Sequence, residues 1–191
     1  MITAILLAAG QSKRLKNENK LIKLFKKKLL INHILSSLIK SKVNKIIIVL
    51  GFEHLKVKKK LLKSKKIKFV INKNYKKGIS SSIKTGLRSL SKDNKGFLIV
   101  QGDMPNITKT TINKIILLIN KSRKEIFLPR FKNRIGNPIG FKKSMIKNIN
   151  KIKGDRGAKN IIKKNSKKIK FININSKSIL TNFNTKKDFS S

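Results

Sequence analysis

A glycine–aspartate pair after an apolar run is the strongest indication of chemistry in this sequence. Residues 96–100 predict a buried strand, and Gly102-Asp103 lies at its carboxyl end. Pro105 then stiffens the exit. A carboxylate fixed there is a good Mg²⁺ ligand, because magnesium takes one or two carboxylates and completes its shell with water and phosphate oxygens. The alternative is a turn aspartate that caps a helix near Thr110, and we favour the metal role.

A second group of candidate residues follows the first apolar run of the chain. Residues 2–9 are too few to span a membrane and predict a buried strand that ends at Gly10. Ser12, Arg14 and Lys20 follow in a polar loop. Backbone N–H groups and flexible cations at the carboxyl end of a strand suit a polyphosphate. The plainer interpretation is a strand followed by a solvated lysine loop, and the pattern matches neither a P-loop nor a dinucleotide fingerprint.

Residues 72–87 form a third polar segment, in which Asn72 precedes Gly78 and Ser82. One interpretation is a loop whose serine caps the next helix, since serine is a favoured N-cap. The other is a loop that contacts an anion or a base, with Gly78 close to the ligand and the serines at a helix N-terminus. The residues alone leave both interpretations open.

Three later segments have a structural interpretation of their own. Residues 134–141 predict a turn followed by an apolar strand. Asp155 is suited to cap a helix over residues 156–164. Near the end of the chain, Thr185 and Asp188 have the spacing of a capping box for a terminal helix.

The composition is strongly basic, with 49 Lys+Arg against 7 Asp+Glu and a formal charge of +42. Such a charge is typical of nucleic-acid binding, but only six of these cations are arginine and the lysines are spread over the whole chain. We therefore interpret the charge as compositional bias and expect no specific nucleic-acid partner. The absence of cysteine excludes disulfides and thiolate metal sites. With neither a signal peptide nor a membrane span recognisable, we expect no membrane partner and a cytoplasmic protein.

Strands and helices are predicted to alternate along the chain. The predicted strands cover residues 2–9, 45–51, 67–72, 96–100, 126–130 and 169–174, and the predicted helices cover 28–40, 53–63 and 110–122. Alternation of this kind indicates βαβ units and a parallel sheet. We predict one domain over residues 1–191, with a three-layer α/β/α, Rossmann-like architecture and a mostly parallel sheet.

Several of these motifs, those in residues 72–87, 134–138 and 154–158 included, resemble a known family. Leu7-Ala8-Ala9-Gly10, with Ser12, Arg14 and Lys20 downstream, resembles the loop that wraps the triphosphate in the MobA-like nucleotidyltransferases. Gly102-Asp103-Met104-Pro105 is similar to the metal motif of that family, and the resemblance covers residues 3–189. Leu-Ala-Ala-Gly is most similar to the molybdenum cofactor cytidylyltransferase branch, whereas Asn182-x-Asn184 is also found in guanylyltransferase relatives.

The resemblance implies a role for individual residues. It implies catalytic roles for Arg14, Lys20 and Asp103, and Mg²⁺ held by Asp103 and Asn182. The nucleotide-binding residues that it implies are Leu7, Ala8, Ala9, Gly10, Ser12, Arg14, Lys20, Asn72, Gly78, Ser82 and Gly102. The acceptor-binding residues that it implies are Arg134, Gly136, Asn137, Pro138, Gly154, Asp155 and Gly157.

The implied reaction is transfer of CMP from CTP to a phosphomonoester, with release of pyrophosphate. The implied acceptor is the molybdenum cofactor, and the resemblance allows a molybdoenzyme or a chaperone as delivery partner. A guanylyltransferase and a sugar-phosphate or polyol-phosphate nucleotidyltransferase are the alternatives. No side-chain nucleophile is required, which agrees with the absence of cysteine and of any Ser/His/Asp constellation.

Overall fold

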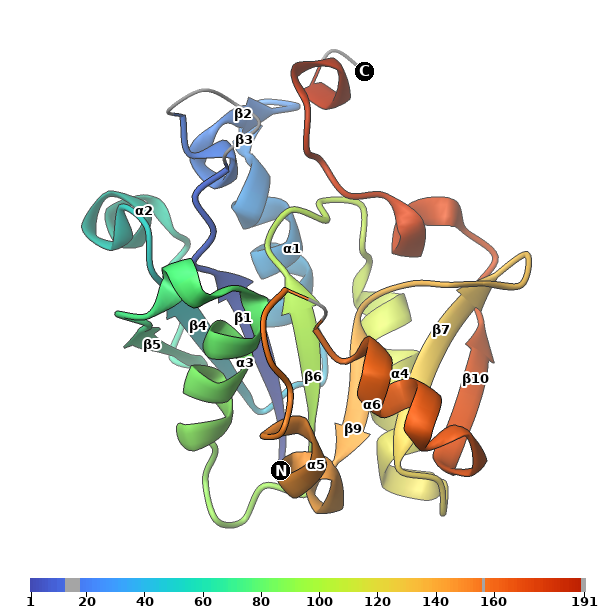
Figure 1. Ribbon diagram of the computed structural model, residues 1–191. Helices are drawn as coiled ribbons and strands as arrows, with labels where there is room; N and C mark the ends of the chain where they lie inside the picture. Colours follow the sequence, from blue (N-terminus) through green and yellow to red (C-terminus); the bar gives the residue numbers. More distant parts are fainter. Residues whose placement is uncertain (13–17, 156, 190–191) are drawn as a thin grey trace.

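The computed structural model describes residues 1–12, 18–155 and 157–189, and a single large β-sheet forms the centre of this part of the chain (Figure 1). Within the described residues the sheet has eight strands, in the order β10-β7-β9-β6-β1-β4-β5, with β8 paired to β7. Its strands are β1 (Ile2–Ala8), β4 (Lys45–Leu50), β5 (Ile67–Ile71), β6 (Gly96–Gln101), β7 (Ile126–Phe131), β8 (Arg134–Ile135), β9 (Ile139–Lys142) and β10 (Ile169–Asn173). A separate small hairpin joins β2 (Leu24–Phe25) to β3 (Lys28–Leu29).

Most neighbouring strands are parallel, and β9 is the exception inside the sheet. β1 pairs parallel with β4 and β6, β5 pairs parallel with β4, and β10 pairs parallel with β7. β9 runs antiparallel to both β6 and β7, and β8 forms an antiparallel pair with the end of β7. The predicted mostly parallel α/β sheet is therefore confirmed.

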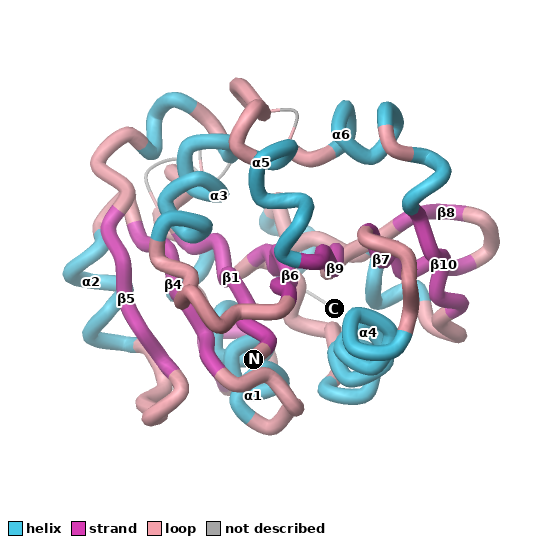
Figure 2. Tube along the Cα trace, turned by 90° about the horizontal axis from the view of Figure 1, so that it is seen from below, coloured by secondary structure: helices cyan, strands magenta, loops and turns pink. Residues whose placement is uncertain are grey.

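Helices cover both faces of the sheet, as the end-on view shows (Figure 2). The helices are α1 (Leu30–Ile39), α2 (His54–Lys60), α3 (Ile79–Arg88), α4 (Lys109–Lys121), α5 (Ile146–Ile149) and α6 (Lys159–Lys164). Helices α1 and α4 lie on one face, and α3, α5 and α6 lie on the other. The predicted three-layer arrangement is confirmed.

The burial pattern of β1 explains these layers. All seven residues of β1 are buried, as expected of a central parallel strand that is covered on both faces. Leu6 belongs to the core cluster under α1 and α4, whereas Ile5 and Leu7 belong to the cluster under α3 and α5. Gly86 lets α3 approach closely, since a Cβ there would lie 2.3 Å from Cγ2 of Ile5.

The predicted elements agree with the observed ones except near some ends. The helix expected over residues 53–63 ends at Lys60, and the one expected over 156–164 begins at Lys159. The expected terminal helix is a single 3₁₀ turn over Lys186–Phe189. None of the helices in the described part of the chain has the length and hydropathy of a membrane span.

Candidate active site

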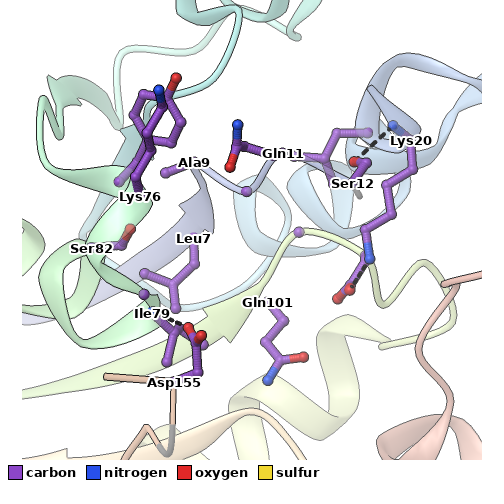
Figure 3. Close-up of a pocket in the computed structure, with 16 residues that line it drawn as sticks. Leu7, Ala9, Gln11, Ser12, Lys20, Lys76, Ile79, Ser82, Gln101 and Asp155 are labelled. Atoms are coloured by element: carbon purple, nitrogen blue, oxygen red, sulfur yellow. Dashed lines mark hydrogen bonds and ion pairs between the residues drawn. The ribbon is translucent and has the colours of Figure 1, made fainter. Parts of the chain in front are cut away.

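A pocket of about 390 Å³ opens at the carboxyl ends of β1 and β6, where the two strands lie side by side (Figures 1 and 3). Its walls come from the loops after these strands, the start of α3 and the loop before α6. The lining residues are Leu7, Ala9, Gly10, Gln11, Ser12, Lys20, Leu21, Tyr75, Lys76, Gly78, Ile79, Ser82, Gln101, Gly102, Asp103 and Asp155. The structure thus brings Gly10 and Asp103 to one pocket.

One end of the pocket is charged and centres on Asp103. The Lys20 ammonium lies 2.6 Å from Oδ2 of Asp103, and their side chains are only 15% and 16% exposed. The same ammonium donates to the Phe183 carbonyl at 3.0 Å and to Oδ1 of Asn184 at 2.8 Å. Lys20 therefore connects the loop after β1 to Asp103, which follows β6, and to the C-terminal segment at residues 183 and 184.

The C-terminal segment is fixed to the β6 loop through its backbone. The Phe183 N–H donates to the Asp103 carbonyl at 2.9 Å, and the Phe183 ring packs edge-on against Phe25. Asn182 turns its amide nitrogen toward Oε1 of Gln101 and, at 3.4 Å, toward Oδ1 of Asp103. These contacts hold the Phe183 carbonyl and the Asn184 amide oxygen near the carboxylate.

Asp103 does not cap a helix. Helix α4 begins at Lys109, and its N-cap is Thr108, whose side chain accepts from the Thr111 N–H. The alternative interpretation of Asp103 as a turn aspartate that caps the helix near Thr110 is therefore wrong. Its carboxylate is committed to Lys20 and Asn182 at the pocket.

The glycine loop leaves open space beside the charged end. A Cβ built on Gly10 would meet no atom of the described residues within 4 Å, so a ligand can approach this backbone closely. Ser12 has a left-handed φ of 53°, and its Oγ accepts from the Lys20 N–H at 3.1 Å. Gly102, in contrast to Gly10, lies against β1, where its N–H donates to the Leu7 carbonyl at 3.0 Å. Arg14 lies outside the described residues.

The other end of the pocket is built on the N-terminus of α3. Oδ1 of Asp155 accepts from the Ile79 N–H at 2.9 Å, and the Gly154 carbonyl accepts from the Ser80 N–H at 3.1 Å. The interpretation of Asp155 as the cap of a helix over residues 156–164 is wrong, because Asp155 caps α3 instead. The N-cap position of α3 is Gly78, so the interpretation of a serine as its N-cap is also wrong.

Asn72 and Ser82 stabilise the α3 end of the pocket. Asn72 is buried and donates to Oγ of Ser81 at 2.8 Å and to Oγ of Ser82 at 3.0 Å. Its own Oδ1 accepts from the Asn74 N–H, which fixes the turn after β5. Ser82 lines the pocket and Asn72 does not, so Asn72 orients the residues that face the cavity.

Several predicted site residues are not among those that line the pocket. These are Ala8, Asn72, Asn182, Arg134, Gly136, Asn137, Pro138, Gly154 and Gly157. Gly136 packs against the C-terminal segment, where a Cβ would lie 2.3 Å from the Ile179 carbonyl oxygen. The Asn137 N–H donates to that same oxygen, and the Asn137–Pro138 peptide is cis. This turn connects β8 to β9, and its residues do not line the pocket.

Other lining residues were missed by the sequence analysis. Gln101 faces the middle of the pocket, between Lys20 and Asp155 (Figure 3). Its position directly before Gly102 at a strand end was a usable signal. Tyr75 and Lys76 belong to a 3₁₀ turn over Tyr75–Lys77 and were not among the predicted site residues.

The residues around Asp103 fit a hard divalent cation. The described residues contain no cluster of three or more His, Cys, Asp or Glu side chains. One carboxylate with neighbouring amide and carbonyl oxygens nevertheless suits Mg²⁺, which binds through one or two carboxylates and takes its other ligands from water and phosphate. Asp103 would hold the ion, with the Phe183 carbonyl and Oδ1 of Asn184 beside it, whereas Asn182 turns its amide nitrogen toward Asp103 and so does not offer it an oxygen.

Comparison with known families agrees with this geometry. The family model described as MobA-like NTP transferase domain matches residues 4–169. The chain belongs to this family. The matched range contains the glycine loop, Asp103 and Asp155, so the pocket is built from the family domain. Membership of this family identifies the chain as a nucleotidyltransferase.

Solved structures share the fold over nearly the whole chain. Rv0371c from Mycobacterium tuberculosis H37Rv superposes with a TM-score of 0.87 at 20% identity, covering 99% of this chain and 95% of that one. A nucleotidyl transferase from Methanothermobacter has a TM-score of 0.83 at 18% identity, with 100% and 94% covered. A 4-diphosphocytidyl-2C-methyl-D-erythritol synthase from Anaerococcus prevotii has a TM-score of 0.80 at 16% identity, with 99% and 92% covered. Rv0371c has also been solved with manganese, at a TM-score of 0.76 and 19% identity, with 92% and 89% covered.

Proposed function

We propose that this protein transfers CMP from CTP to a phosphomonoester acceptor, the molybdenum cofactor, and releases pyrophosphate. The observation that carries the proposal is the meeting of Gly10, Lys20 and Asp103 at one pocket. Open backbone, a cation and a metal-binding carboxylate are the groups that a nucleoside triphosphate needs at its phosphates. Transfer of GMP to the same acceptor and transfer to a sugar or polyol phosphate are the alternatives.

The reaction requires positioning and charge stabilisation more than a protein nucleophile. A phosphate oxygen of the acceptor attacks the α-phosphorus of CTP, a new O–P bond forms, and the bond to the β-phosphate oxygen breaks. Lys20 and Arg14 offset the negative charge of the triphosphate, and the Gly10 backbone leaves room for it. Mg²⁺, when bound by Asp103, would neutralise phosphate charge and act as a Lewis acid.

The base would lie at the α3 end of the pocket. Leu7 and Ile79 offer apolar contacts there, and Ser82 and Gln101 offer polar groups to a base edge. Ala9 is 4% exposed, and its Cβ packs against Gly51. Most of this methyl group therefore faces the β4 loop, and only part of it can narrow the base site.

We expect CTP to be preferred over GTP, and Ala9→Gly to relax the preference by less than about tenfold. One methyl group is worth about 1–3 kcal/mol when it contacts the substrate fully, and here the contact is partial. Measuring kcat/KM for CTP and GTP in both proteins checks this expectation. A wild-type protein that prefers GTP contradicts the cytidylyl assignment and leaves the phosphate chemistry standing.

The proposal is tested by pyrophosphate release with each of the four NTPs, with and without molybdenum cofactor. The expected result is Mg²⁺-dependent release that requires both CTP and the cofactor. Release that requires a sugar or polyol phosphate instead would replace the acceptor. No release with any NTP and either acceptor class would contradict the proposed function.

A further inference from the structure

The Lys20 ammonium donates to three oxygen acceptors. Among the described residues its acceptors are Oδ2 of Asp103 at 2.6 Å, Oδ1 of Asn184 at 2.8 Å and the Phe183 carbonyl at 3.0 Å. An ammonium has three N–H donors, so each one has a partner. The three acceptors come from two segments about 80 residues apart in the sequence, and Lys20 from a third.

These acceptors are the ligand types of a hard metal ion. A carboxylate, a side-chain amide oxygen and a backbone carbonyl are common donors to Mg²⁺, Mn²⁺ and Ca²⁺. In this structure they converge on a cation, and the cation is a side chain of the protein itself. We call Asp103, Phe183 and Asn184 the oxygen cage.

We infer that Lys20 is an internal cation that fills the oxygen cage in the free protein and keeps divalent metal out until a nucleotide binds. The inference rests on the proposed function for its nucleotide step, because the triphosphate is what draws Lys20 away. It also adds Asn184 and the Phe183 carbonyl to the groups that face the metal. The family resemblance implies only Asp103 and Asn182 as metal ligands.

Electrostatics give the reason for the exclusion. Two cations a few ångströms apart repel each other strongly in a partly buried site, so the ammonium and a divalent ion cannot share the carboxylate without a compensating anion. A triphosphate is such an anion, and it offers Lys20 new acceptors. Metal and nucleotide should therefore bind together, with each strengthening the other.

The position of Lys20 allows this exchange. Its backbone N–H is held by Ser12, so the residue starts beside the glycine loop where the phosphates are expected. Its four-carbon side chain can turn from the cage to that loop by rotamer changes alone. The backbone bond from Phe183 to Asp103 does not involve Lys20, so the cage persists when the ammonium leaves.

The test measures Mn²⁺ binding to the protein without nucleotide, by the loss of the free-ion EPR signal. We expect Lys20→Met and Lys20→Gln to bind Mn²⁺ at least about tenfold more tightly than wild type. Lys23→Met is the matched control, because Lys23 lies on the same loop and is paired with Glu18 outside the cage. It removes the same charge and should bind Mn²⁺ as wild type does.

The double variant Lys20→Met/Asp103→Asn identifies the site of the gain. We expect it to lose the tight Mn²⁺ binding that Lys20→Met acquires. The inference is overturned if both Lys20 variants, folded by circular dichroism, bind Mn²⁺ no more tightly than Lys23→Met. It is also overturned if the double variant keeps the gain, since the ion would then bind elsewhere.

A second measurement separates this inference from the proposed function. Binding of α,β-methylene-CTP is followed by calorimetry at rising Mn²⁺ concentration. We expect wild type to bind the analogue and Mn²⁺ cooperatively, and Lys20→Gln to lose that cooperativity. If no nucleotide binds any of these proteins but the Lys20 variants still gain Mn²⁺ affinity, the proposed function fails and the internal cation stands. If the analogue binds and cooperativity is unchanged in Lys20→Gln, the internal cation is wrong and the function stands.

Discussion

The two ends of the pocket are each occupied by a charge from the chain itself. At the β6 end an ammonium, Lys20, sits among oxygens of Asp103 and Asn184. At the α3 end a carboxylate, Asp155, sits on the N-terminus of a helix. Each group therefore stands where a ligand of the same sign would bind, a metal ion at one end and an anion at the other.

The two arrangements differ in how easily the charge can leave. Lys20 reaches its acceptors with a long, flexible side chain. Asp155 has a short side chain, and its loop is also fixed by the backbone bond from Ser80 to Gly154. On the inference above the β6 end is exchangeable and is where we expect the chemistry, whereas the α3 end is a fixed support. The helix terminus is then unavailable to the phosphates, which we place at the Gly10 loop.

The largest effect is expected from Asp103→Asn, which breaks the exchangeable end. Turnover should fall by at least about a hundredfold, comparable to the loss of one key electrostatic stabiliser. The free energy of unfolding should change by about 1 kcal/mol or less, since asparagine keeps the shape and can still hydrogen-bond to Lys20. Steady-state kinetics and urea unfolding measure the two effects.

Asp93→Asn is the matched control for this prediction, because Asp93 is an exposed carboxylate away from the pocket. Its activity should equal that of wild type. Full Mg²⁺-dependent turnover in Asp103→Asn would show that the β6 end does not carry the chemistry.

Gly78→Ala should break the fixed end through the backbone. Gly78 has φ 90°, and a Cβ there would lie 2.6 Å from Oδ1 of Asp155 and 2.8 Å from the Gly154 carbonyl carbon. A strained residue of this kind costs about 1–3 kcal/mol, which urea unfolding can measure.

Gly10→Ala provides the contrast at the other end. Its Cβ would meet no atom within 4 Å in the described part of the chain, so we expect stability within about 0.5 kcal/mol of wild type. Its nucleotide affinity should fall, because the new methyl group enters the space left for the phosphates. Equal losses of stability in Gly10→Ala and Gly78→Ala would contradict the distinction between the two ends.

Asp155→Ala should have a smaller effect on stability. Loss of a helix cap costs about 0.5–2 kcal/mol, and Asp155→Asn should cost only a few tenths because an amide oxygen still accepts from Ile79. Thermal unfolding of the two variants measures the cap. The KM for the acceptor shows whether the carboxylate also binds substrate, as the family resemblance implies: a raised KM in both variants would support that role.

The smallest effect is expected when the pH is lowered, and it concerns Asp188, which accepts from the Asn184 N–H at the edge of the oxygen cage. The pKa of Asp188 is held below its usual value of 3.8, because the backbone N–H groups of Thr185 and Asn184 donate to it. A lowered folded-state pKa contributes stability that is present above the unfolded pKa and is lost as the pH falls through the folded value. The Thr185 amide resonance should therefore stay constant at neutral pH and shift only below about pH 4. In Asp188→Asn the shift should be absent, and a shift of equal size there would assign it to another group.

The fold could be predicted because its strands are strong local signals. The apolar runs of β1, β4 and β6 are long, bounded by polar residues, and separated by lengths that suit crossover helices. Strand order then placed Gly10 and Asp103 at the same edge of the sheet. The capping partners were not predictable in this way. Asp155 was close in sequence to one helix and caps another that begins 76 residues earlier.

The oxygen cage could not be predicted from the sequence alone. Nothing local in Asn182-Phe183-Asn184 distinguishes a metal-facing segment from a surface loop. Its position depends on the backbone bond from Phe183 to Asp103 and on the packing of the Phe183 ring against Phe25. The motif resemblance indicated Asn182, whereas the structure places the Asn184 oxygen against the cation.

The long sequence separations within the pocket have a consequence for folding. Lys20 is 83 residues from Asp103 and 164 from Asn184, and Ile79 is 76 from Asp155. Closing such loops costs entropy that only a formed sheet can offset, so these contacts should form late. A nascent chain that has left the ribosome as far as Pro105 already contains the glycine loop and the Gly102-Asp103 motif. It does not yet contain Phe183 and Asn184, so it has no oxygen cage. Nucleotide competence would then arise only once β10 and the residues after it have docked.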